Sequence, residues 1–266
     1  MRTLTLTTVL VCLGGALTFA GPESLPSSGK EMKETIAPAP PTCDFNWTGF
    51  YIGGKAGYGW GNSEINDVTF TGPNPQQLVT NHHDLNPEGF VGGGELGFNW
   101  QIGKFFVLGA AADFFGSGMS GDFHLVADFE SGPPAVFSGS EDINWFGTVR
   151  GRVGFAPICR LLIYGTGGFA YADVDESALI DYRPTAGAGS SFYPASRSDT
   201  DTGWTAGGGL EFAVGHHWTI KAEYLHIDVG DNGKAAPQTP AFFGFFAHYH
   251  WQNEFDTVTA GLNFKF

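Results

Sequence analysis

Charged residues are scarce in this chain of 266 residues. Asp, Glu, Lys and Arg together make up 15% of it, and 27 acidic residues outweigh 13 basic ones, for a net charge of −14. A soluble domain carries about 25% charged residues. Nucleic-acid binding needs a basic surface, so the composition argues against that class of partner. With three cysteines, the chain also lacks the framework of a disulfide-rich secreted domain.

Long apolar runs are missing beyond residue 20. The N-terminal run from Leu4 to Phe19 follows a positive charge at Arg2 and ends with small residues at Thr18 and Ala20. This layout predicts a secretory signal peptide over residues 1–20. The alternative, an N-terminal membrane anchor, is disfavoured because the run is shorter than the ~20 residues that a spanning helix needs.

Glycine and phenylalanine are abundant instead, with 40 and 25 residues. Residues 21–45 are rich in Pro and Ser, which predicts an extended Pro-rich periplasmic tether without a core of its own. From Trp47 onward, apolar and polar residues alternate, as in β-strands. The last segment shows this most clearly, because Val258, Leu262 and Phe264 alternate with polar or small residues.

Eight segments follow this pattern, each about as long as the ~9–11 residues that cross a bilayer as a tilted strand. Short and long connections between them alternate strictly, which is typical of outer-membrane barrels with tight periplasmic turns and long external loops. The sequence therefore predicts an all-β fold over residues 46–266, an eight-stranded antiparallel transmembrane β-barrel with four long external loops. The eight segments are 50–60, 90–100, 105–115, 145–155, 161–172, 204–214, 218–227 and 257–266.

The charges within these segments fall on the face opposite the apolar residues. A lipid-facing Lys or Arg at mid-bilayer costs about 2–4 kcal/mol, so this face is predicted to line the lumen. Enclosed charges must be paired or solvated, and the near-balance of signs predicts a network of ion pairs. The alternative is a soluble sheet with solvated charges, which leaves a large aromatic band exposed. The nine predicted lumen charges are Lys55, Glu95, Asp113, Arg150, Arg152, Glu211, Lys221, Glu223 and Lys265.

Four stretches carry a resemblance to a known family: residues 47–54 (WTGFYIGG), 164–171 (YGTGGFAY), 221–225 (KAEYL) and 259–266 (TAGLNFKF). They resemble the OmpA-like outer-membrane β-barrel family, in the branch of opacity and immunogenic outer-membrane proteins, which is often labelled porin-family or haem-binding. The resemblance implies the bacterial outer membrane and insertion by the barrel-assembly machinery, which reads a terminal aromatic residue. Phe266 matches that residue. The tether and the external loops are longer than in many relatives.

Two pairs of histidines in the predicted external loops are candidate ligands for a metal ion or a haem iron. They are the adjacent His82 and His83, and His248 with His250, which stand at i and i+2, where side chains of an extended segment project to one side. The alternative is that these histidines are solvated loop residues. Cys43 and Cys159 are both predicted at the periplasmic end, where they form either a disulfide that fixes the tether or two free thiols.

The sequence thus predicts a surface antigen of the cell envelope with a structural or surface-interaction role. A small porin-like channel is the first alternative, and a haem- or metal-binding surface receptor is the second. No spacing of Ser, His and Asp marks a nucleophile, so we expect neither an enzyme nor a cofactor. The expected partners are outer-membrane lipid and lipopolysaccharide, the barrel-assembly machinery, and an external surface ligand.

Overall fold

The computed structural model describes residues 45–61, 63–71, 83–127, 135–182, 191–237 and 246–266. The predicted signal peptide and nearly all of the tether lie outside these residues. Among the described residues there is no helix with the length and apolarity to cross a bilayer. The described chain forms ten strands: β1 (Gly49–Gly61), β2 (Ser63–Thr71), β3 (His83–Leu85), β4 (Glu88–Ile102), β5 (Phe106–Ala127), β6 (Ala135–Ile158), β7 (Leu161–Tyr182), β8 (Ser191–Ala213), β9 (Trp218–Pro237) and β10 (Phe246–Lys265).

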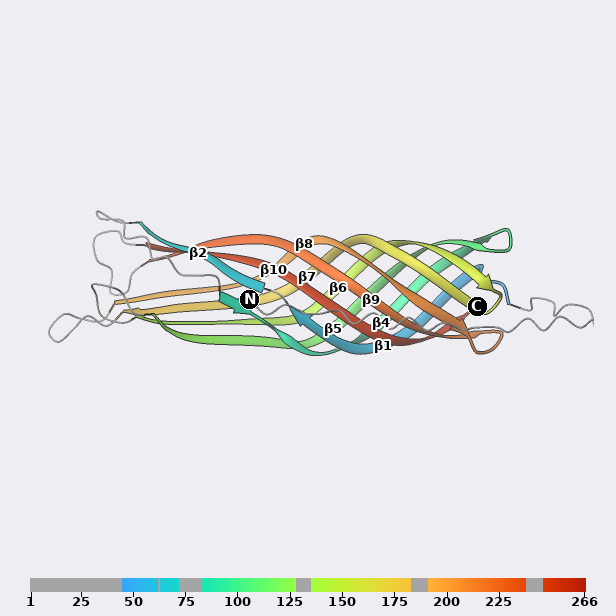
Figure 1. The fold of residues 1–266 in the computed structure, drawn as a ribbon, viewed down its shortest axis with the longest axis horizontal. Helices are drawn as coiled ribbons and strands as arrows, with labels where there is room; N and C mark the ends of the chain where they lie inside the picture. The colour runs from blue at the N-terminus through green and yellow to red at the C-terminus, as the bar shows by residue number, and fades with distance from the viewer. Residues whose placement is uncertain (1–44, 62, 72–82, 128–134, 183–190, 238–245) are drawn as a thin grey trace, which may run out of the picture. The chain divides into compact units, whose positions relative to one another are not determined.

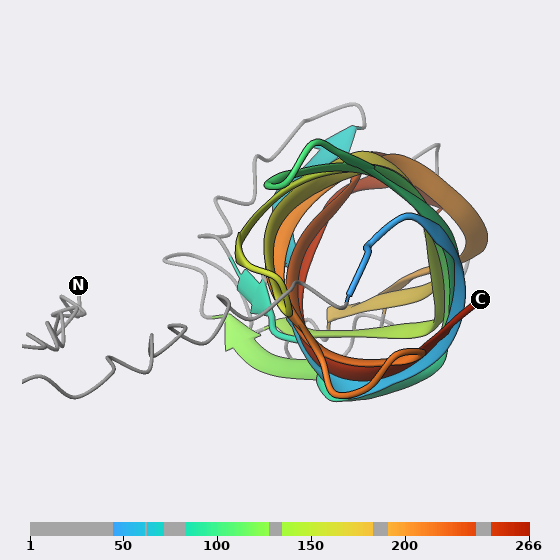
Figure 2. The ribbon, with the colours of Figure 1, turned by 90° about the vertical axis from the view of Figure 1, so that its right-hand side faces the viewer.

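Eight of these strands close into a ring. Each pairs antiparallel with its neighbour in the order β1-β4-β5-β6-β7-β8-β9-β10, and β10 pairs back onto β1 (Figures 1 and 2). The two short strands add to the ring at its external end, where β2 pairs with β10, and β3 with β2. The predicted eight-stranded antiparallel barrel is confirmed.

The strands extend further than the sequence pattern predicted. The segments expected to span 10–12 residues lie within strands of 22 to 24 residues in β5, β6, β7 and β8. Much of the length assigned to external loops is therefore paired β-structure, which we call the extension. Alternation of apolar and polar residues marks only the part of a strand whose outer face meets hydrocarbon. Beyond it both faces carry polar residues, so the pattern fades while the backbone pairing continues.

The outer wall of the ring is apolar and aromatic. Directly opposite residues in antiparallel strands share a face, and most of the exposed large side chains lie on the outer face along the predicted spanning segments. The belt includes Phe50, Trp60, Phe90, Trp100, Phe114, Val149, Phe169, Trp204, Leu210, Trp218, Ile220 and Leu262. Past this belt the outer face of β6 and β7 turns polar, with Asp142, Asn144 and Asp175. The hydrocarbon boundary therefore lies between these two zones.

The start of the described chain turns into the ring at the end with short turns (Figure 2). Phe45 and Trp47 are buried there and form an apolar cluster with Val107, Ala156, Leu162, Tyr164 and Ala213. Trp47 is fixed at both ends, because its backbone N–H donates to Gln101 Oε1 at 2.8 Å and its indole N–H donates to the Cys159 carbonyl at 3.2 Å. This segment closes the periplasmic mouth of the barrel.

Candidate functional site

A network of charged side chains crosses the middle of the lumen. Lys55 on β1 lies at its centre, and its Nζ is 2.7 Å from Asp113, 2.9 Å from Glu223 and 3.3 Å from Glu95. These carboxylates come from β5, β9 and β4, and the side chains of all four residues are 0–2% exposed. One lysine therefore joins strands from several sides of the ring.

Two more cations complete this cluster. The Arg150 guanidinium on β6 donates to Asp113 and, at 3.0 Å, to Glu223. Lys221 Nζ on β9 lies 2.5 Å from Glu95 and 3.6 Å from Glu223. Each carboxylate is thus shared between at least two cations, which is the arrangement that offsets the desolvation of buried charges.

A second cluster lies on the periplasmic side of the first. Arg152 donates to Glu211 at 2.8 Å and to the Tyr51 hydroxyl at 3.1 Å, and its guanidinium lies 3.9 Å from the centre of the Tyr164 ring. Glu211 also accepts from the Thr219 hydroxyl at 2.6 Å. The Tyr164 hydroxyl donates to Glu223 at 2.8 Å, which connects the two clusters.

Glycine makes room for this network at defined positions. Lys55 stands opposite Gly93 on one side and Gly261 on the other. A Cβ at Gly93 would come within 2.0 Å of the Phe114 carbonyl oxygen, and one at Gly261 within 2.8 Å of Lys55 Cγ. The missing side chain at Gly261 therefore leaves room for the stem of Lys55, whereas the one at Gly93 lets the backbones of β4 and β5 lie close together.

Apolar layers enclose the charged layer on both sides. Along β5 the buried side chains Val107, Asp113 and Phe115 follow in order from the short turns outward. Val107 belongs to the periplasmic cluster, whereas Phe115 belongs to a second apolar cluster further out. That external cluster comprises Val91, Phe115, Met119, Ile143, Phe146, Ala170, Ala172, Val174, Leu225, Ile227, Val229 and Phe255. The charged network is therefore enclosed between two apolar layers.

The structure brings eight of the nine predicted lumen charges into these two clusters, four cations against four anions. Lys265 lies apart at the periplasmic rim, partly exposed, with its Nζ 5.6 Å from the centre of the Phe45 ring. The sequence reading missed the inward aromatic residues Phe115 and Phe146 and the tyrosine partners of Arg152. Residue parity could have found Phe115, because it shares a face with Asp113.

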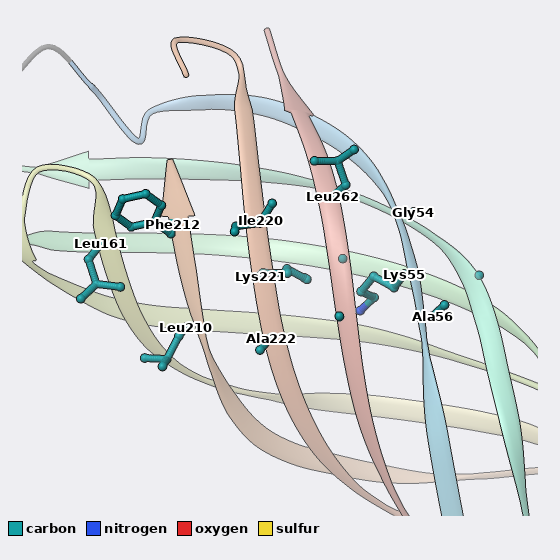
Figure 3. Close-up of a pocket in the computed structure, with 13 residues that line it drawn as sticks. Gly54, Lys55, Ala56, Leu161, Leu210, Phe212, Ile220, Lys221, Ala222 and Leu262 are labelled. Carbon is teal, nitrogen blue, oxygen red and sulfur yellow. The ribbon is translucent and has the colours of Figure 1, made fainter. Parts of the chain in front are cut away.

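A groove lies on the outer wall (Figure 3). Its volume is about 810 Å³, and Leu210, Phe212, Ile220 and Leu262 surround a floor of small residues. Figure 3 labels Gly54, Ala56 and Ala222 on this floor, with Lys55 and Lys221 beside it. Because the ammonium groups of both lysines are turned into the lumen network, the groove offers hydrocarbon a shallow apolar surface and no reactive group.

A separate polar cluster fills the extension above the external apolar layer. Glu176 on β7 is buried, accepts from Asn253 Nδ2 at 2.7 Å across the lumen, and lies 3.6 Å from Arg197. Arg197 also pairs with Asp201 and Asp199. Burial raises the pKa of Glu176 above its usual value. The extension thus has a polar interior of its own.

This pKa shift makes the extension sensitive to pH. Because the folded pKa of Glu176 is raised, the folded state holds a proton that the unfolded chain has released, and stability falls as the pH rises through that window. We expect Glu176→Gln to remove this loss. Hydrogen exchange of the backbone amides in the extension strands, compared at acidic and neutral pH and corrected for intrinsic rates, measures this loss of stability.

Asp175→Asn is the matched control, with the opposite sign. Asp175 is half-buried, and hydrogen bonds from Ser198 and Asn144 lower its pKa, so its contribution is lost as the pH falls. A Glu176→Gln protein with the pH slope of the wild type would contradict the assignment.

The predicted metal ligands fall largely outside the described side chains. His82 lies outside the described residues, and only the backbones of His83 on β3 and of His248 and His250 on β10 are described. Among the described residues, no group of three His, Cys, Asp or Glu side chains is placed to hold a metal ion. The histidine site stays a prediction.

Cys159 is disulfide-bonded, and its partner lies outside the described residues. Because Trp47 donates to the Cys159 carbonyl, the chain just after Cys43 runs beside this cysteine. We expect no free thiol in the unfolded, unreduced mature protein and one in Cys43→Ser, counted with a thiol-specific dye. Two reactive thiols in the wild-type protein would exclude the Cys43–Cys159 bridge.

Phe266 follows directly after β10 and lies on the outer wall. Its side chain is exposed, and its backbone N–H donates to the carbonyl of Phe50 at 3.0 Å. Phe50 belongs to β1, the strand with which β10 pairs to close the ring. The aromatic residue is thus accessible beside the β1–β10 seam. Its role as an assembly signal stays a prediction.

Known proteins match most of this chain. It is 36% identical over 236 residues to the 31 kDa outer-membrane immunogenic protein of Brucella melitensis, covering 88% of this chain and 90% of that protein. It is 32% identical to the 22 kDa outer membrane protein of Rhizobium leguminosarum bv. viciae, covering 69% of this chain and 64% of that protein.

Among solved structures, OprG of Pseudomonas aeruginosa covers 84% of this chain and 98% of its own, at 12% identity and a TM-score of 0.46. Ail of Yersinia pestis covers 82% and 99%, at 14% identity and a TM-score of 0.37. The model of the outer membrane protein beta-barrel domain matches residues 35–266. The chain therefore belongs to the outer membrane protein β-barrel family and is a protein of the bacterial outer membrane.

Proposed function

We propose that this protein is a closed barrel with a structural and surface-interaction role, whose extension meets the outside. The observation that carries the proposal is the burial of the lumen network. The side chains of Lys55, Glu95 and Asp113 are 0% exposed, although they stand where a channel needs a column of water. Eight strands enclose an interior that side chains can fill, and here they fill it.

The two apolar layers support the same reading. An ion that crossed the lumen would have to pass Trp47 and Leu162 on the periplasmic side and Phe115 and Phe146 on the external side, all at most 1% exposed. This arrangement disfavours the porin-like alternative. It also leaves the charged network without access for a substrate, which favours a role other than catalysis.

The expected partners follow from the outer wall and from the relatives. The aromatic belt fits lipid, and the rim above it fits the headgroup region, where lipopolysaccharide lies. Relatives named immunogenic are consistent with an extension that is displayed at the cell surface. Insertion by the barrel-assembly machinery through Phe266 belongs to the same proposal.

Planar-bilayer recording tests the closed lumen. We expect the refolded wild-type protein to give no steady conductance steps under conditions in which a 16-stranded porin gives them. Tryptophan fluorescence on the same sample confirms that the barrel is folded and inserted. Reproducible steps from folded protein would replace the closed barrel by the channel alternative.

A further inference from the structure

The groove on the outer wall has a floor of alanines, which stand in one row across three strands (Figure 3). Ala222 on β9 lies directly opposite Ala260 on β10, and Ala260 lies directly opposite Ala56 on β1. All three side chains are exposed on the outer face. Because a methyl group projects little from the sheet, this row forms a hollow in the wall.

Large side chains border the floor on both sides along the strands. The next row toward the short turns holds Phe212, Ile220 and Leu262. The next row toward the external end holds Tyr58, Val258 and Tyr224. The hollow is therefore a bounded site in the outer wall, with a volume of about 810 Å³.

The floor lies near the middle of the bilayer. Ala222 follows His217 of the β8–β9 turn by five residues, which is about 17 Å along a strand at ~3.4 Å per residue. A strand tilt of about 40° leaves about 13 Å of this length along the membrane normal. One leaflet of a hydrocarbon core of ~30 Å is about 15 Å thick. An acyl chain whose headgroup is level with the short turns therefore ends at the floor.

The three short turns at the periplasmic end carry positive charge and contain no Asp or Glu. Their sequences are GKF (103–105), APICR (156–160) and VGHH (214–217). The side chains of Lys104 and Arg160 are exposed. Arg160 directly precedes Leu161, which lines the groove. A phosphate at this end of the groove would therefore meet a cation.

The external rim of the wall has the opposite charge. Glu88, Asp142, Asp228 and Asp256 lie on the outer face beyond the aromatic belt, and each is exposed or half-buried. These carboxylates repel a phosphate unless a cation neutralises them. The two rims thus favour an anionic headgroup at the periplasmic end of the barrel, where phospholipids form the leaflet.

We propose that the groove binds one acyl chain of an anionic phospholipid in the periplasmic leaflet, with the lipid phosphate at Arg160. Lipid tails are as apolar as the wall, so the chain gains packing rather than hydrophobic burial. A hollow with raised borders supplies contacts on several sides of the chain, which a flat wall does not. This inference rests on the proposed structural role in the envelope and names a lipid partner for the outer wall.

A second copy of the chain is the other candidate occupant of a floor of small residues. Small residues favour protein association in membranes when they let two backbones approach closely. Here Ile220 and Leu262 on one side and Tyr58 and Tyr224 on the other project beyond the alanines. These side chains hold a second barrel away from the floor, whereas a single hydrocarbon chain fits between them.

Native mass spectrometry of the full-length mature protein tests the proposal. The barrel is released from nanodiscs that hold equal amounts of dioleoylphosphatidylglycerol and dioleoylphosphatidylcholine, which share the same chains. We expect monomeric barrels that retain one phosphatidylglycerol molecule. The preference over phosphatidylcholine should be at least about fivefold, the factor that one cation near an anionic lipid supplies. Equal retention of the two lipids would overturn the proposal.

Filling the floor tests the position of the chain. Ala222→Leu raises the floor, and we expect it to remove most of the retained phosphatidylglycerol. Ala110→Leu is the matched control, because Ala110 is exposed on the outer wall of β5, away from the groove. Tryptophan fluorescence confirms that each variant is folded, and Ala260→Leu fills the same floor if Ala222→Leu does not fold. The same retention in the filled and control variants would place the lipid elsewhere and overturn the proposal.

Removing single cations tests the position of the phosphate. We expect Arg160→Gln to lower the preference for phosphatidylglycerol about fivefold. Lys104→Gln makes the same charge change in a turn whose residues do not line the groove, and we expect it to keep the preference. Equal losses would show that the basic rim attracts lipid without a defined site, which contradicts the proposal.

The same mass spectra report the oligomeric state. Dimers that dissociate in Ala222→Leu and persist in Ala110→Leu would identify a second copy as the occupant, and the proposal would be wrong. None of these outcomes depends on conductance, so a failed lipid site and a failed closed barrel give different results.

Discussion

Replacing Glu223 by glutamine is expected to destabilise the folded barrel by about 3–5 kcal/mol, the range for breaking a buried ion pair from one side. Glu223 accepts from Lys55 at 2.9 Å, from Arg150 at 3.0 Å and from the Tyr164 hydroxyl at 2.8 Å. Glutamine keeps the shape but leaves the buried network with one excess positive charge. Urea unfolding in lipid vesicles, followed by tryptophan fluorescence, gives the free energy of unfolding.

Glu88→Gln is the matched control, because Glu88 is exposed on the outer rim. We expect its effect to stay within about 0.5 kcal/mol. Adding Lys55→Met to Glu223→Gln removes both charges and should recover part of the loss, as expected for coupled neighbours. A loss below about 1 kcal/mol for Glu223→Gln would mean that water screens the network, and the closed-lumen proposal would fall with it.

The substitution Val149→Arg is expected to destabilise the inserted barrel by about 2–4 kcal/mol, the cost of an arginine at the bilayer midplane. Val149 lies on the outer wall of β6 and is 55% exposed. Hydrocarbon surrounds this position, and a guanidinium there loses its hydration without gaining a partner. The same unfolding assay measures the loss, and protection from added protease reports whether the variant inserts.

Val126→Arg is an unusually close control. Val126 is 56% exposed on the outer face of β5, but in the extension rather than in the belt. Since water already surrounds this position, we expect a change within about 0.5 kcal/mol. Equal losses in the free energy of unfolding for Val149→Arg and Val126→Arg would show that the bilayer does not set the cost at Val149. The boundary of the hydrocarbon region between these two positions would then be wrong.

The ring and its charged interior follow largely from the sequence. Period-two alternation sorts Lys55, Glu95 and Arg150 to one face of their strands, and the structure places all three in the lumen. The strict alternation of short and long connections predicts an antiparallel up-and-down order. Both patterns are local, since they depend on the two faces of a single strand and on the length of a single connection.

The pairing within the lumen does not follow from the sequence. Lys55 meets Glu223, 168 residues away, because the ring closes between β1 and β10 and turns both side chains into one interior. The inward Phe115 and Phe146 reveal a limit of the sorting rule, since a lumen filled by side chains accepts apolar residues beside paired charges. Lys265 shows a second limit of the rule. Its position in the alternation is that of an inward residue, but it lies at the periplasmic rim and therefore outside the network.

The sequence alone determined that water-preferring side chains share one face of eight segments and that lipid-preferring side chains share the other. Only the tertiary structure decided which charges pair, where the apolar layers lie, and how far the strands continue beyond the membrane. The physical reason is that the face of the sheet to which a side chain points depends only on whether its position within the strand is odd or even. Pairing and closure depend on which strands become neighbours and in what register.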